Sequence, residues 1–397
     1  MEKDNARKNV LLLALIQFFN QINFYSVIII LYFADITGSY MLGMSIFSIA
    51  TISTAILEVP TGILSDRIGR KKTIVLGSIC SIISNITLLI TYNYQLLIVY
   101  AIFNGLEKSL FSGNNDAYVY DNLKLKAEER TYVGVIGKVK SMTYLASAIS
   151  ALIGGVLLFI FSYKLVIAIS IIPKIIQLIL SIKLKETKKY NADNNLIKNI
   201  KLPFKEVIKN HILMRKILAD SIMKSINESC YQFRTTFYQI VWVEWALGIP
   251  RVLSNIGAFV SNWIGEKVVS KMSRKNIIIF SNTYSIFSNI LGASLQNVLS
   301  PIVMVSNSLF QTEYIDAEIE QKLYKDEYRA SMGSIKSLFE NCFFSLFSVF
   351  LGVLADNFSI IAAFIIFQLL RIIPLIMTVK IINNMKKQNY FGELKLT

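Results

Sequence analysis

The sequence lacks most of the residues from which metal and redox centres are built. It contains one histidine and three cysteines, and Cys80, Cys230 and Cys342 lie in separate apolar runs without Cys-x-x-Cys or Cys/His spacing. A structural zinc site needs closely spaced Cys or His ligands, and a disulfide framework needs paired cysteines. We therefore predict no metal site and no disulfide, and interpret the three cysteines as small apolar residues.

The sequence also lacks the motifs of common catalytic and nucleotide-binding sites. It has no Ser/His/Asp order, no cluster of metal ligands and no Gly-x-x-x-x-Gly-Lys-[Ser/Thr] loop. The single histidine, His211, lies in a polar stretch, where a solvated or interfacial role is expected and a proton relay is the alternative. We predict neither an enzyme nor an ATP-driven pump, and we expect no cofactor.

Charged residues are scarce and apolar residues are abundant. Of the 397 residues 17% are charged and 54% are hydrophobic, and the mean hydropathy is +0.51. One soluble core cannot bury so much apolar surface, so most of it must face lipid. The net charge of +15 is distributed in short basic blocks between apolar runs, which argues against nucleic-acid binding. The composition predicts an all-α polytopic membrane protein in a lipid bilayer.

Twelve apolar runs are long enough to cross a bilayer, which takes about 20 residues. They lie near 10–33, 42–62, 73–91, 95–118, 132–160, 163–182, 214–241, 249–270, 276–295, 299–317, 330–354 and 358–379. Basic residues gather on one side of these runs, at the N-terminus and in 67–72, 124–130, 183–216, 271–275 and 322–329, whereas the other side has only Lys164 and Arg251. The positive-inside rule then predicts that both termini are cytoplasmic. The Ile, Asn and Lys bias suggests a bacterial plasma membrane.

The two halves of the sequence resemble each other at an offset near 200 residues. Asp116-Ala117 corresponds to Asp316-Ala317, and Lys71-Lys72 corresponds to Arg274-Lys275. Such repeats are typical of transporters in which two bundles move about a central site. We expect an N-terminal six-helix bundle (1–183), a cytoplasmic linker (184–213) and a C-terminal six-helix bundle (214–397).

The charged string GILSDRIGRKK, residues 62–72, lies between the second and third apolar runs. Gly62 and Gly69 permit a tight turn, Asp66 can cap or pair, and Arg67, Arg70 and Lys71 suit anionic headgroups. This string resembles the signature loop between helices 2 and 3 of the major facilitator superfamily; an ordinary basic interface loop is the alternative. The resemblance implies twelve transmembrane helices in two six-helix pseudo-symmetric bundles. It also implies a cytoplasmic conformational latch formed by Asp66, Arg70 and Asp121.

Two further strings resemble those of putative drug and macrolide exporters. They are EVPTG, residues 58–62, and SGNNDAYVYD, residues 112–121. In ASAISALIGG, residues 146–155, Ser150-Ala151 replaces the Gly-Pro step that drug antiporters carry on the fifth helix. The missing Gly-Pro step departs from the drug-antiporter pattern, and the resemblance still favours proton-coupled export over uptake.

Polar residues recur on the predicted first, fourth, seventh and tenth spans. Because such residues are costly against lipid, we expect them to line a substrate cavity, with hydrogen bonding between helices as the alternative. The cavity candidates are Gln17, Asn20, Gln21, Asn104, Lys108, Asn115, Lys224, Asn227, Tyr231, Asn307 and Gln311. The alternative includes an i,i+4 ion pair between Lys224 and Glu228. Glu58, Glu107 and Glu228 are the candidates for proton coupling, because a carboxyl group inside a span can exchange protons with either side.

These features predict a secondary active transporter that exports a small amphipathic compound in exchange for protons. Proton-coupled import of a small solute is the nearest alternative, and a transport-inactive receptor or scaffold is the third. We expect a monomer.

Overall fold

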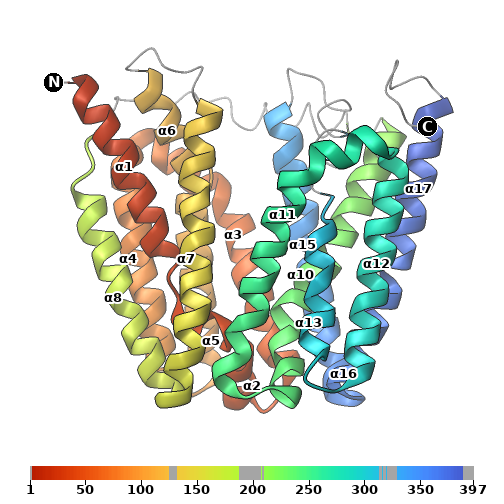
Figure 1. Ribbon diagram of the computed structural model, residues 1–397. Helices are drawn as coiled ribbons and strands as arrows, with labels where there is room; N and C mark the ends of the chain where they lie inside the picture. The colour runs from red at the N-terminus through yellow and green to blue at the C-terminus, as the bar shows by residue number, and fades with distance from the viewer. Residues whose placement is uncertain are drawn as a thin grey trace. The chain divides into compact units, whose positions relative to one another are not determined.

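The computed structural model describes residues 2–124, 132–186, 207, 210–312, 315, 319 and 329–387. Every element among them is a helix (Figure 1), so the predicted all-helical class is confirmed for this part of the chain. Most of the predicted linker and of the basic loops at 124–130 and 322–329 lies outside it. Two compact units are present, Met1–Asp193 with Glu244–Ile249, and Asn194–Val243 with Pro250–Thr397.

Six helices in the described ranges are long and apolar enough to span a membrane. Large apolar side chains are exposed on them, for example Ile56, Phe159 and Leu346. Such exposure is costly in water and expected in lipid. The six helices are Tyr40–Ile68, Arg70–Leu89, Val135–Ile160, Tyr163–Ile182, Met332–Asn357 and Ile360–Asn384.

The first unit is a bundle in which distant parts of the chain pack side by side. Helix α1 packs against α7 and α8, α3 lies along α5, and α4 contacts both α5 and α8. The short 3-10 helix η3 (Glu244–Gly248) also packs on α7. The other elements are α1 (Glu2–Gln21), η1 (Phe24–Val27), α2 (Ile29–Thr37), α3 (Tyr40–Ile68), α4 (Arg70–Leu89), α5 (Tyr94–Phe111), α6 (Asn114–Lys124), α7 (Tyr132–Ile160) and α8 (Tyr163–Ile182).

The predicted first span, 10–33, is not one helix. Helix α1 ends at Gln21, and two side chains of neighbouring helices bind the backbone beyond it. Ser150 Oγ accepts a hydrogen bond from the N–H of Asn23 at 2.9 Å, and Ser170 Oγ accepts one from the N–H of Phe24 at 3.1 Å. These serines satisfy backbone groups that a continuous helix would have paired internally, which makes a break tolerable inside a bundle.

Three other predicted spans are also interrupted. The fourth breaks at Ser112 and Gly113, where Gly113 has a positive φ of 65°. In the tenth, the short helix Ser300–Val305 is followed by the 3-10 turn Ser306–Phe310, and Gln311 is extended. The twelfth span, Ile360–Asn384, contains a one-residue turn at Arg371 that separates α16 from α17. Apolar composition located these spans, but it does not reveal where the helices within them are interrupted.

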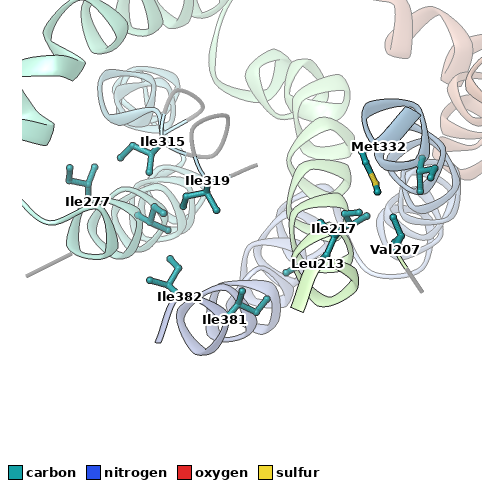
Figure 2. Packing of buried hydrophobic residues seen from close by; sticks show 12 residues of the cluster. Val207, Leu213, Ile217, Ile277, Ile315, Ile319, Met332, Ile381 and Ile382 are labelled. Carbon is teal, nitrogen blue, oxygen red and sulfur yellow. The ribbon is translucent and has the colours of Figure 1, made fainter. Parts of the chain in front are cut away.

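The second unit is held at one end by a cluster of buried aliphatic residues. Leu213 and Ile217 of α10 meet Met332 of α15, while Ile277 of α12 and Ile381 of α17 belong to the same cluster (Figure 2). The cluster therefore joins the first turns of α10, α12 and α15 to the last turns of α17. The elements are α10 (His211–Val241), α11 (Ile249–Lys271), α12 (Arg274–Leu295), α13 (Ser300–Val305), η4 (Ser306–Phe310), α15 (Arg329–Asn357), α16 (Ile360–Leu370) and α17 (Ile372–Lys387).

Candidate functional site

The string at 62–72 is almost entirely helical. Helix α3 continues to Ile68 and α4 begins at Arg70, so Gly69 alone separates them, with φ at 97°. The expectation that Gly62 serves a turn is wrong, because Gly62 lies inside α3 with open space where a side chain would stand. The turn rests on Gly69, the residue type that adopts this backbone conformation at least cost.

A carboxylate that the sequence analysis missed lies against this turn. Glu186 accepts hydrogen bonds from the backbone N–H groups of Arg70, at 3.1 Å, and Lys71, at 3.2 Å. A negative charge is favourable there, because the first N–H groups of a helix lack internal partners. A Cβ atom on Gly69 would lie 2.5 Å from Glu186 Oε2. The sequence signal was a lone glutamate in the basic stretch after the sixth span.

Two of the three predicted latch residues form an ion pair. Arg70 Nε lies 2.8 Å from Asp121 Oδ2, and both side chains are mostly buried. Asn114 supports them by donating to the Arg70 carbonyl at 3.1 Å and accepting from Ser65 Oγ at 2.7 Å. Asp66 makes no hydrogen bond or ion pair with another described residue. The strings at 58–72 and 112–121 thus form one packed unit.

Glu58 contributes to the contact between the same strings. Its Oε1 accepts a hydrogen bond from Ser112 Oγ at 2.8 Å. Thr61 Oγ1 donates to the Ser109 carbonyl at 3.1 Å. Glu58 is therefore placed at the break between α5 and α6, where it binds a neutral hydroxyl group.

Glu107 lies inside the first unit beside a lysine that the sequence analysis missed. Glu107 is 6% exposed and Lys174 of α8 is 1% exposed. Their side chains are close enough to interact electrostatically without a direct ion pair, and Ser81 is also near the carboxyl group. Lys174 Nζ donates to the backbone carbonyl of Asn20, at the end of α1. A lysine in the apolar run IIPKIIQ could have been found, because an ionisable residue within a span is itself a functional signal.

The other cavity candidates of the first unit do not form one stripe. Lys108 is exposed whereas Glu107 is buried, since consecutive positions point in different directions around a helix. Asn115 follows the break at Gly113, so its spacing from Asn104 does not describe one helix face. The remaining candidates are partly buried: Gln17, Asn20, Gln21 and Asn104.

The expected pair of Lys224 with Glu228 is also wrong. Lys224 Nζ instead lies 2.6 Å from Glu340 Oε2 on α15, and Glu228 Oε1 accepts from Gln232 Nε2 at 2.7 Å. An interhelical partner replaces the i,i+4 partner because α10 packs along α15.

The remaining candidates of the second unit contact several elements. Tyr231 has the guanidinium of Arg251 5.5 Å above its ring centre, and Asn227 is partly buried. Asn307 Nδ2 donates to Ser285 Oγ at 3.1 Å. Gln311 donates its backbone N–H to Ser261 Oγ at 2.9 Å. Asn307 and Gln311 are thus tied to different helices, α12 and α11.

Two arginines within the second unit were missed. Arg371, 2% exposed, lies between α16 and α17, and Arg234 lies on α10. Arg371 Nη1 donates to Gln368 Oε1 at 2.8 Å and to Ser285 Oγ at 3.0 Å, and Arg234 Nη2 donates to Asn289 Oδ1 at 3.3 Å. All of these acceptors are neutral.

Long apolar helices with charged groups held between them are typical of a multi-pass membrane protein. The chain belongs to the Major Facilitator Superfamily, whose sequence profile matches residues 10–310. A curated relative, an uncharacterized MFS-type transporter of Methanocaldococcus jannaschii, is 31% identical over 108 residues, and this match spans only 27% of each chain. The resemblance to this superfamily inferred from residues 62–72 is confirmed.

Solved transporters share the fold. The nucleoside transporter NupG has a TM-score of 0.80 at 11% identity, covering 95% of this chain and 99% of that one. A bacterial homologue of the human lysosomal transporter Spinster has a TM-score of 0.74 at 13% identity, covering 96% and 98%. The peptide transporter POT in complex with sulfate has a TM-score of 0.75 at 13% identity, covering 96% and 95%.

Proposed function

We propose that this transporter exports a small amphipathic organic compound in exchange for protons by alternating access. Its family membership supports transport, and the similarly folded nucleoside and peptide transporters carry small organic solutes. The proposal includes twelve membrane helices, a monomer, a plasma-membrane location and cytoplasmic termini. The placement of basic residues along the sequence supports this orientation.

The burial of Glu107 is the observation that supports the proposal of proton coupling. Of the three candidate carboxylates it alone is buried, whereas Glu58 is partly buried and Glu228 is exposed. A buried carboxyl group beside a buried ammonium group can gain or lose a proton with a large effect on its surroundings, because charges interact strongly away from water. Lys174 connects this group to the broken first span through the Asn20 carbonyl. Protonation of Glu107 is thereby linked to the backbone position at which α1 ends.

The charged strings around Gly69 form the proposed conformational latch. Arg70 and Asp121 provide its ion pair, and Glu186 fixes the start of α4. We retain Asp66, Arg67 and Lys71 as latch residues that engage during the transport cycle. An Asp66→Asn variant should then insert into the membrane normally and transport slowly, and wild-type flux in that variant contradicts the role of Asp66.

The decisive experiment measures both the direction of transport and its coupling to the proton gradient. Accumulation of a compound panel is compared between a deletion strain and the complemented strain, with and without a protonophore. Export predicts higher accumulation in the deletion strain and loss of the difference with the protonophore. Lower accumulation on deletion indicates import, and no difference for any compound indicates a receptor or scaffold.

Coupling through Glu107 is then tested with the compound identified. In proteoliposomes, Glu107→Gln should abolish flux driven by a pH gradient while preserving exchange of compound across the membrane. Glu228→Gln is the matched control, because this carboxylate is exposed and its hydrogen-bond partner among the described residues is the neutral Gln232. Gradient-driven flux that survives both substitutions rules out both carboxylates as the coupling group.

A further inference from the structure

The second unit contains two arginines on facing elements. Arg234 and Cys230 are four residues apart on α10 and so share a helix face. Gln368 of α16 donates to Cys230 Sγ at 3.3 Å and accepts from Arg371 Nη1 at 2.8 Å. Arg371 donates to Ser285 and Arg234 donates to Asn289, and these two acceptors are four residues apart on α12, so the guanidinium groups lie near each other. Two positive charges are thus brought together by neutral side chains.

These charges lack a carboxylate partner. Neither arginine forms an ion pair with an aspartate or glutamate among the residues that the structure describes. The Nε atoms of both arginines are buried and have no hydrogen-bond partner there, and the same holds for the nearby Tyr238 hydroxyl. Burying the Arg371 guanidinium without a counter-charge is unfavourable, and unpaired donors add to that cost.

A bound anion would supply the missing charge. Arginine is suited to this role because its planar N–H donors match the oxygens of a carboxylate or phosphate. Arg234, Ser285 and Asn307 are partly exposed, so the cluster has an accessible side. The Ser285 Oγ atom accepts from both Arg371 and Asn307, and it connects a predicted cavity residue to the buried arginine.

We infer that Arg234 and Arg371 form a binding site for the oxyanion group, carboxylate or phosphate, of a small organic solute. The inference rests on the proposed function only in taking this solute to be the transported compound. Asn307 and Ser285 position the group, and Tyr238 is an additional donor. An amphipathic substrate would then carry its negative charge at this end.

Binding to the purified full-length protein in detergent tests this site independently of transport. Calorimetry and thermal unfolding are measured with benzoate, phenyl phosphate, inorganic phosphate and the uncharged benzamide, which has nearly the shape of benzoate. Benzoate or phenyl phosphate should bind and raise the unfolding temperature, and benzamide should bind about tenfold more weakly or worse, since hydrogen bonds to a charged group are lost. Inorganic phosphate that binds as tightly as phenyl phosphate identifies the free ion as the ligand and overturns the organic part of the inference.

Substitutions test which arginines bind the anion. Arg371→Gln and Arg234→Gln should each weaken anion binding about tenfold or more, and Arg215→Gln, an exposed arginine on the same helix, should leave it unchanged. If Arg371→Gln does not fold, the partly exposed Arg234 decides the outcome. Equal binding of benzoate and benzamide, or wild-type anion affinity in the Arg234→Gln variant, overturns the site. If the purified protein binds the anion but shows no proton-driven flux, the proposed function is contradicted and the anion site is not.

Discussion

The carboxylate of Glu186 accepts a hydrogen bond from the backbone N–H of Arg70, at 3.1 Å. This hydrogen bond connects the segment just after α8 to the first turn of α4. The carboxylate also fills the space beside Gly69 that a side chain would need. The most characteristic string of the sequence is therefore held by a residue more than a hundred positions away.

Gly69→Ala should destabilise the protein. Alanine at a φ of 97° costs about 1–2 kcal/mol, and its Cβ would displace Glu186. We expect a lower unfolding temperature in detergent and reduced transport. Gly62→Ala is the matched control in the same string, and it should be neutral or stabilising by up to about 1 kcal/mol because Gly62 is helical with open space around it. Equal effects of the two substitutions would contradict the assignment of the turn to Gly69.

The pair of Arg70 and Asp121 should show energetic coupling. The side chains are 16% and 19% exposed, so solvent screens them only in part, and we expect a coupling free energy of about 1–2 kcal/mol. A double-mutant cycle with Arg70→Gln and Asp121→Asn, read by thermal unfolding, measures this term. Strictly additive effects would show that the pair contributes nothing to stability, leaving only its transport role to be examined by flux.

Lys174→Met should destabilise the first unit and alter coupling. It removes the positive charge that acts most strongly on Glu107, and Coulomb attraction over several ångströms at an effective dielectric constant near 20 is worth about 2 kcal/mol. Adding Glu107→Gln to Lys174→Met should recover much of the unfolding temperature but not gradient-driven flux. A double variant that is no more stable than Lys174→Met would show that the two charges do not depend on each other.

The sequence predicted the helical class, the family and the Arg70 and Asp121 pairing through different signals. Apolar runs located the membrane helices, and the string at 62–72 identified the superfamily because its glycines and charges occur in a fixed order. The same signals missed Glu186, since a partner distant in sequence leaves no local pattern. They placed Gly62 in a turn because glycine is compatible with both a turn and an exposed helix position.

The buried charges were missed for another reason. Lys174 and Arg371 are single ionisable residues within apolar stretches, and a search for stripes of polar residues passes over isolated ones. Arg234 lies six residues after Glu228 on the polar seventh span, beyond the stripe that ends at Tyr231. Treating each ionisable residue inside a span as a candidate would have found all three. Lys224 was assigned to Glu228 because helical spacing is visible in a sequence, whereas the packing of α10 on α15 that offers Glu340 is not.

The break in the first span should depend on two serines of neighbouring helices. Ser170→Ala removes the acceptor of the Phe24 N–H, and Ser150→Ala removes that of the Asn23 N–H. Both serines are at most 1% exposed, so each substitution leaves a backbone donor unpaired at a cost of about 1–3 kcal/mol. Ser141→Ala is the control on α7, because Ser141 is exposed and bonds only within its own helix, and its effect should stay within about 0.5 kcal/mol. Unfolding temperatures in detergent compare the three variants, and amide hydrogen exchange at Asn23 and Phe24 should rise in the two buried-site variants. Unchanged exchange would mean that these N–H groups find other partners and that the serines do not maintain the break.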